Sequence, residues 1–137
     1  MEKILQNDFL KVSWDQPSAL LSVEWSSKTE AMSDKEYKDL LMTISGFILK
    51  NNIKKWLGDT KEFAFAISPT LQEWTSQEFN KRLLDGGLEK MALIIPKEFF
   101  ANLAVQQTID EMQQTNHEKS FETRYFDNIN DAISWLN

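Results

Sequence analysis

The segment that most constrains this chain is residues 91–96, which read Met-Ala-Leu-Ile-Ile-Pro. The run is short, apolar and uncharged, with Gly86 and Gly87 before it and Pro96 at its end. An apolar run of this length between chain-breaking residues indicates a β-strand that is buried on both faces. Such a strand needs helices above and below it, so the run predicts an α/β fold.

Residues 53–59 are expected to form a second strand, parallel to the first, because a long helical pattern separates the two. Two earlier segments, residues 9–14 and 20–25, alternate apolar and polar side chains, which is typical of half-buried strands. A turn composition lies between them, so we expect an antiparallel hairpin. Each of these strands ends its apolar side with a tryptophan, Trp14 or Trp25. We expect the two rings to cover one end of the core.

Helix signals follow the hairpin. Ser33 and Glu36 have the spacing of a capping box. Apolar residues follow at helical spacing and predict a stripe that packs on the sheet: Tyr37, Leu40, Leu41, Ile44, Phe47 and Ile48. Gly46 lies inside this helix and would let it approach the sheet closely. The helix is expected to end at Asn51-Asn52.

Residues 60–68 fit either a short extended piece or a loop folded over the sheet edge. Pro69, Thr70 and Glu73 then predict a second helix start with another capping box. That helix is expected to end at Gly86-Gly87. Four of its residues share one face: Leu71, Trp74, Phe79 and Leu83.

The last third of the chain predicts a helix from Pro96 to about Gln114, a strand at residues 120–126, and a final helix capped by Asn128. The apolar residues of the final helix fit one face: Ile129, Ala132, Ile133 and Leu136. The element order is β-β-α-β-α-β-α-β-α. We therefore expect one domain over residues 1–137, built on a single mixed, mainly parallel β-sheet with helices packed on it.

Composition narrows the classes of function. The chain has 137 residues, of which 42% are hydrophobic, and it has no cysteine, which excludes disulfides and thiolate metal sites. A formal charge of −6 argues against nucleic acid as a partner. We find no charged-then-apolar leader and no apolar run long enough to span a membrane. We therefore expect a soluble cytoplasmic protein.

Four local motifs, in this order, resemble the SpoIIAA-like branch of the STAS superfamily. They are Trp-Leu-Gly-Asp at residues 56–59, Gln-Glu-Trp at 72–74, Gly-Leu-Glu-Lys-Met-Ala at 87–92, and the closing Phe-Asp-Asn-Ile-Asn-Asp-Ala-Ile-Ser-Trp-Leu at 126–136. The resemblance spans most of the chain. It implies a small regulatory or ligand-binding module rather than an enzyme, with a protein partner or a homodimer as its assembly.

The resemblance also implies a site at Asp59 and Thr60. Anti-sigma-factor antagonists of the superfamily carry a phosphorylatable serine after an aspartate at the end of the third strand. This chain departs from that pattern, because residues 61–69 separate Thr60 from the next helix, whose N-terminus would otherwise favour an added phosphate. Asp59 and Thr60 are either a ligand-facing or phospho-acceptor pair at a strand end, or a turn in which Asp59 accepts backbone amides.

Four aromatic residues near that strand end also allow two interpretations. Trp56, Phe63, Phe65 and Trp74 could line a pocket for a lipid-like or other apolar small molecule. The interpretation that we favour is core, because aromatic side chains at strand and helix spacing usually pack inside. If the segment from Phe63 to Ile67 is exposed instead, it would form a contact with a partner protein or a second copy.

No catalytic constellation is visible. His117 is the only histidine and lies in a polar stretch, which predicts a solvated loop residue rather than a metal ligand. The four glycines lack the spacing of a phosphate-binding loop. We therefore expect a protein that is not an enzyme, with no cofactor and no metal.

Overall fold

A computed structural model of the chain describes residues 1–100 and 121–137. Within these residues six strands form one sheet: β1 (Glu2–Gln6), β2 (Leu10–Asp15), β3 (Leu20–Trp25), β4 (Lys55–Asp59), β5 (Lys90–Ile94) and β6 (Glu122–Phe126). The helices are α1 (Asp34–Asn51), α2 (Pro69–Trp74), α3 (Asn80–Asp85) and α5 (Ile129–Leu136). A 3-10 turn (Ser27–Ala31) precedes α1, and a π-helical segment (Thr75–Phe79) joins α2 to α3.

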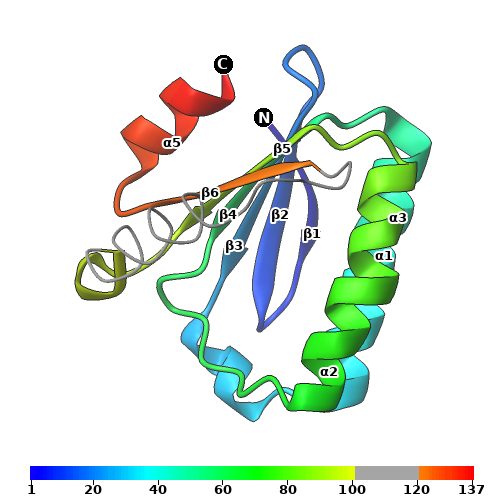
Figure 1. Ribbon diagram of the computed structural model, residues 1–137, viewed down its shortest axis with the longest axis vertical. Coiled ribbons are helices and arrows are strands. Elements are labelled where there is room, and N and C mark those ends of the chain that lie inside the picture. The colour runs from blue at the N-terminus through cyan, green and yellow to red at the C-terminus, as the bar shows by residue number, and fades with distance from the viewer. Residues whose placement is uncertain (101–120) are drawn as a thin grey trace, which may run out of the picture.

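The sheet is mixed and mainly parallel, as predicted. Its strands lie in sequence order from β1 to β6 (Figure 1). The pairs β1–β2 and β2–β3 are antiparallel, whereas β3–β4, β4–β5 and β5–β6 are parallel. The two strands expected at residues 53–59 and 91–96 are neighbours, with Trp56 opposite Met91. The α/β fold class is therefore confirmed.

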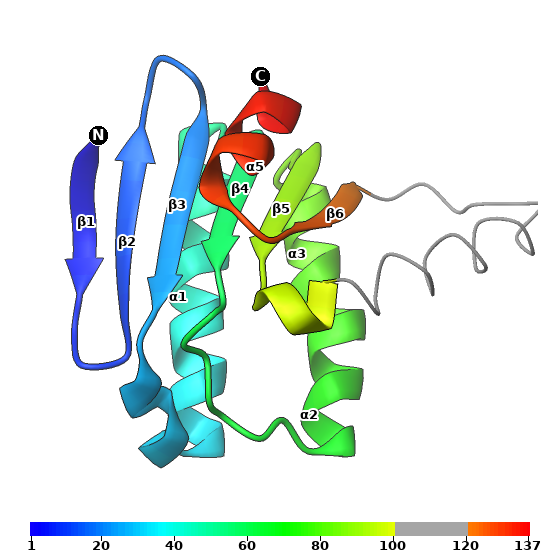
Figure 2. The ribbon, with the colours of Figure 1, turned by 90° about the vertical axis from the view of Figure 1, so that its left-hand side faces the viewer.

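Helices cover both faces of the central strands. Figure 2 shows α1, α2 and α3 on one face of the sheet and α5 on the other. Met91 belongs to the large apolar core on the first face, and Ala92 and Ile94 belong to a smaller core under α5. Ala92 and Ile94 are 0% and 1% exposed. Burial of β5 on both faces is thus confirmed.

Strand β1 was not predicted, so the expected element order lacked its first member. β1 lies at the edge of the sheet and carries charged and polar side chains at Glu2, Lys3 and Gln6. Its pairing with β2 shifts register between Lys3 and Leu5, which is a β-bulge. A bulge adds one residue and breaks the two-residue alternation by which a strand is identified in a sequence.

The hairpin β2–β3 is confirmed, but its two tryptophans do not cover the same end of the core. Trp14 pairs with Leu21 and Trp25 pairs with Leu10. In an antiparallel pair the last residue of one strand lies beside the first part of the other, so equivalent positions occupy opposite ends. The expectation that the two rings cover one end of the core was therefore wrong.

Helix α1 begins and ends as predicted. The Ser33 hydroxyl accepts a hydrogen bond from the Glu36 amide at 3.1 Å, and the Glu36 carboxylate accepts one from the Ser33 amide at 2.9 Å. Asn52 follows the helix in the left-handed conformation, with φ of 53°. Gly46 does not serve close packing on the sheet, because the nearest atom to a Cβ placed there is Arg82 Nη2 at 3.9 Å, on α3.

The second helix begins two residues earlier than predicted. The Ser68 hydroxyl accepts a hydrogen bond from the Leu71 amide at 3.2 Å, and Pro69 occupies the first helical position. The predicted capping box of Thr70 and Glu73 was therefore wrong. Proline suits the first helical position because it has a fixed φ and no amide hydrogen to satisfy.

The π-helical segment explains how α2 and α3 share one buried face. In a regular helix Phe79 would lie roughly 80° around the axis from Leu71. The extra residue of a π-bulge removes about one residue of rotation. Leu71, Phe79 and Leu83 then point to the same core, where they are 3%, 4% and 0% exposed. Trp74, which we also expected on this face, is only half-buried.

The C-terminal elements agree with the prediction in part. β6 forms within residues 120–126, and the Asn128 side chain accepts a hydrogen bond from the Asp131 amide at 2.9 Å, which confirms the cap. On α5 only Ala132 and Leu136 are buried, whereas Ile129 and Ile133 are exposed, so the predicted four-residue buried face was wrong.

The helix predicted from Pro96 begins at residue 97. The rest of that helix, and His117, lie outside the described residues. Among the helices that are described, none combines the length and the apolar character needed to cross a membrane.

We expect Gly46→Ala to raise the free energy of unfolding by about 1 kcal/mol. Alanine is favoured over glycine inside a helix by about that amount, and a Cβ at Gly46 makes only an ordinary contact at 3.9 Å. Gly58→Ala is the contrasting variant, since its Cβ would lie 2.8 Å from Trp56 Nε1 and 2.9 Å from Leu93 Cδ2. We expect this overpacking to cost about 1–3 kcal/mol. Urea unfolding of both variants measures the difference, and a destabilised Gly46→Ala protein would contradict the ordinary contact expected for a Cβ at this position.

Candidate ligand-binding groove

Asp59 and Thr60 lie at the carboxyl end of β4, as predicted. The Thr60 amide and hydroxyl both donate hydrogen bonds to the Ile94 carbonyl oxygen, at 2.9 Å and 2.8 Å. The Asp59 carboxylate accepts a hydrogen bond from the Lys61 amide at 3.1 Å. These contacts form a turn that ties the end of β4 to the end of β5. The phospho-acceptor role of Thr60 stays a prediction.

The topology does not open a crevice beside this strand end. In open α/β sheets a ligand crevice forms where successive crossovers leave the sheet on opposite faces. Here α1 connects β3 to β4, and α2 and α3 connect β4 to β5. All three helices lie on the same face of the sheet (Figure 2). Between β3 and β5 the crossovers therefore do not change from one face of the sheet to the other.

Residues 60–68 form a loop, which was the second of the two alternatives. Its side chains still alternate, so that Phe63 and Phe65 are half-buried and point into the core. The Phe63 ring contacts the edge of Trp25, with centroids 5.0 Å apart. The Phe65 ring stacks on Tyr37 at 5.2 Å. The loop thus covers the core with its apolar side.

A buried hydroxyl holds this loop in place. Thr29, in the 3-10 turn before α1, is 0% exposed. Its hydroxyl donates to the Ser26 carbonyl oxygen and accepts from the Ala64 amide, both at 2.8 Å. This bond joins two segments that lie 35 residues apart in the sequence.

Trp56 and Trp74 also pack against the large core. Trp56 is 4% exposed and contacts the edge of Phe79 at 5.9 Å. Its indole nitrogen is buried without a hydrogen-bond partner among the described residues, and its ring occupies the space beside Gly58. Trp74 is half-buried and lies 6.2 Å from Tyr37. The structure thus places the four predicted pocket residues around one core, and a pocket formed by them stays a prediction.

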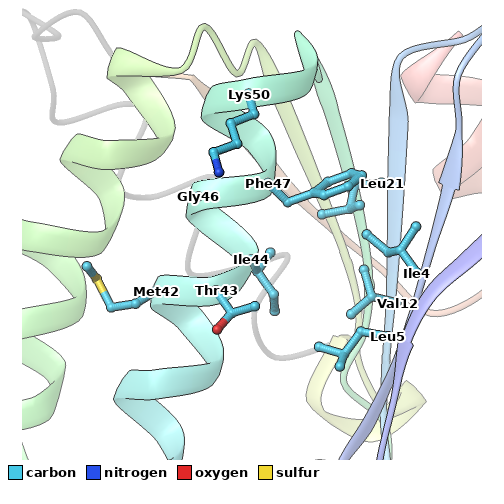
Figure 3. A pocket seen from close by; sticks show the side chains of 10 residues that line it. All are labelled: Ile4, Leu5, Val12, Leu21, Met42, Thr43, Ile44, Gly46, Phe47 and Lys50. Carbon is cyan, nitrogen blue, oxygen red and sulfur yellow. The ribbon is translucent and has the colours of Figure 1, made fainter.

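A groove that the sequence did not reveal lies between α1 and the strands at the β1 edge of the sheet. We call it the α1–β1 groove (Figure 3). Its volume is about 360 Å³. The residues that line it are Ile4, Leu5, Val12, Leu21, Met42, Thr43, Ile44, Gly46, Phe47 and Lys50.

The groove exists because the helical layer ends before the sheet does. β1 forms the edge of the sheet, and its residues Ile4 and Leu5 are only half-buried. Figure 3 shows Phe47 and Ile44 of α1 pointing toward these strands, while Met42 points to the other side of the helix. The Phe47 ring packs edge-on against Trp14 at 5.1 Å.

The lining is apolar with one charged residue. Seven of the ten lining residues have apolar side chains, and Lys50 is the charged one. Such a surface favours an apolar ligand, since a few polar groups in an apolar site fix the orientation of what it binds. Sequence reasoning missed the groove because β1 itself was missed and because Phe47 was assigned to the core stripe of α1.

The described residues offer no group of three or more His, Cys, Asp or Glu side chains that could hold a metal ion. One buried ionisable group stands out in this part of the chain. The Tyr37 hydroxyl forms a hydrogen bond with the Thr75 hydroxyl at 2.7 Å. Burial raises the pKa of the Tyr37 phenol above its usual value, and the bond to Thr75 acts in the opposite direction. The phenol is therefore neutral at physiological pH.

Comparison with known proteins finds no matching family model, no similar curated protein and no similar solved structure. The resemblance to the STAS superfamily stays a prediction.

We expect Thr29→Val to release the loop of residues 60–68. The variant removes the hydroxyl that bonds Ser26 and Ala64, which costs about 1–2 kcal/mol, and hydrogen exchange of the Ala64 amide should become faster. Thr29→Ser is the control, because it keeps the hydroxyl and should preserve protection of that amide. An Ala64 amide equally protected in Thr29→Val would show that the bond does not hold the loop.

Proposed function

We propose that this protein is a non-enzymatic binding module whose α1–β1 groove holds a small apolar molecule. The observation that supports the proposal is the groove itself, an open apolar surface on a folded domain. Its volume of about 360 Å³ falls within the range of roughly 300–1,000 Å³ that is usual for small-molecule sites. Isolated apolar side chains on a surface need no explanation, but a contiguous apolar hollow does.

The size of the groove favours a small molecule over a globular partner. A stable protein interface usually involves about 20–30 residues on each side, and this groove has ten lining residues. One residue at its border can also adapt to a ligand. Leu5 is half-buried on an edge strand, where the backbone is bonded on one side alone.

A second candidate function is association with a protein partner or a second copy, as the STAS resemblance implies. The segment from Phe63 to Ile67 supports this less than expected, because its large side chains are half-buried on the core. Ile129 and Ile133 support it better. They lie one turn apart on α5 and are 51% and 38% exposed. Neighbouring exposed apolar side chains are typical of interaction surfaces.

We expect the groove to bind primary alcohols with an affinity that rises with chain length. Each methylene group that enters an apolar site contributes about 0.8 kcal/mol, which is roughly a fourfold gain in affinity per carbon. Titration of hexanol, octanol and decanol, followed by NMR shifts of the Ile4, Leu5 and Val12 methyl groups, measures this series. A flat series, or shifts that do not saturate, would contradict the proposal.

The matched variants of this experiment are Leu5→Trp and Leu49→Trp. Leu5 lines the groove, and tryptophan there should fill it and abolish alcohol binding without unfolding an edge strand that accepts large aromatic residues. Leu49 is 44% exposed on α1 and lies outside the lining, so Leu49→Trp should bind as the wild type does. Equal binding by both variants would place the alcohols elsewhere.

The second candidate predicts that Ile133→Lys lowers the association constant of the protein with itself. Ile133 is exposed on α5, so the substitution should leave the domain folded while it places a charge in an apolar contact. Sedimentation equilibrium of the wild type and the variant provides the measurement. A wild-type protein that stays monomeric at high concentration would rule out a homodimer.

A further inference from the structure

Gly46 leaves an opening on the surface of α1 at the border of the groove. A Cβ placed on this residue would have Arg82 Nη2 as its nearest neighbour, at 3.9 Å. A Cβ at this position would therefore make an ordinary van der Waals contact with the guanidinium and would clash with nothing. Glycine inside a helix is unfavourable because it adds backbone freedom to the unfolded chain. Here no close packing of backbones accounts for it.

Two cationic side chains flank this opening from different helices. Lys50 follows Gly46 by four residues, which places it on the same side of α1 one turn later, and Figure 3 shows its amino group beside Gly46. Arg82 approaches from α3. Within residues 1–100 and 121–137, neither cation has a carboxylate within ion-pair distance.

The Arg82 guanidinium is held in a fixed position. Its Nε donates a hydrogen bond of 2.7 Å to the hydroxyl of Ser45, a residue that is 0% exposed. Because Nε makes this contact, Nη2 is the guanidinium nitrogen that lies beside the position above Gly46. A guanidinium held in this way binds an anion with little loss of side-chain freedom.

From this arrangement we propose that the ligand of the α1–β1 groove is an anionic amphiphile. Its carboxylate or phosphate lies above Gly46, between Lys50 and Arg82. Its apolar chain runs across the groove toward Ile4 and Leu5. This inference rests on the proposed function, since the apolar part of the ligand occupies the same groove. Lysine and arginine both form charge-assisted hydrogen bonds with carboxylates and phosphates.

The experiment compares four probes with the same ten-carbon chain: decanoate, decyl phosphate, 1-decanol and decyltrimethylammonium. Isothermal titration of the full chain at one pH and one salt concentration gives the four dissociation constants. We expect the two anions to bind most tightly, the alcohol less tightly and the cation most weakly. Because Lys50 is exposed and exposed ion pairs are weak, the anions should gain roughly tenfold over the alcohol.

The comparison of the two anions identifies the head group. Tighter binding of decyl phosphate indicates a phosphate-bearing lipid, and tighter binding of decanoate indicates a fatty acid. Either order supports an anionic amphiphile.

Three variants test the position of the head group. Lys50→Gln removes one cation from an exposed side chain and should weaken decanoate binding by about threefold while it leaves decanol binding unchanged. Gly46→Glu places a carboxylate in the opening, where it can pair with Lys50 four residues on, and should abolish the preference for anions. Gly46→Gln is the matched control, with the same size and no charge, and should keep part of that preference.

The outcomes separate the inference from the proposed function. If no probe binds, the groove is not a ligand site and both fail. If decanol and decanoate bind equally, and Lys50→Gln changes neither affinity, the groove binds apolar molecules but the anionic head group is overturned. Gly46→Glu and Gly46→Gln could also lose anion binding to the same extent. In that case the size of the new side chain excludes the head group, and recognition of its charge at this position is overturned.

Discussion

The fold depends on the burial of β5 on both of its faces. Met91 points into the core beneath α1 and α3, whereas Ala92 points to α5. On the second face α5 packs against β5 through small residues. Ala92 of β5 and Ala132 of α5 are both 0% exposed. Lys90 completes this contact, because its amino group donates a hydrogen bond of 3.0 Å to the Trp135 carbonyl oxygen at the end of α5. A cation at this position also interacts favourably with the helix dipole.

The features that were predicted from the sequence are the ones that local physics determines. Three of these features depend on a few consecutive residues each: the capping box at Ser33, the Asn128 cap and the alternation of β2 and β3. β1 was not predicted, because its bulge interrupts the alternation of apolar and polar residues. The π-helical segment was not predicted, because residues Thr75–Phe79 include no helix-breaking residue. The segment forms because Phe79 must reach a core that is distant in the sequence.

The groove could not be predicted for a different reason. It results from how far the helical layer extends over the sheet, which no single segment encodes. Its lining combines the edge strand β1, both strands of the β2–β3 hairpin and residues of α1. Phe47 was expected in the core, and it is half-buried against Trp14 instead. Gly46 was expected to bring α1 close to the sheet, but a Cβ at this position would meet Arg82 of α3 instead, at 3.9 Å.

The position of the groove follows from how the chain closes its other surface. In most open α/β sheets the carboxyl ends of the parallel strands are left for ligands. Here Thr60 bonds the Ile94 carbonyl oxygen, and the loop that follows packs Phe63 on Trp25. The Thr29 hydroxyl also holds that loop through its bond to the Ala64 amide. The end of β4 therefore serves to anchor the loop. The uncovered apolar surface is shifted to the antiparallel side of the sheet, where β1 extends past α1. A binding function for this protein is therefore better sought beside its edge strand than at the strand end that the fold class would suggest.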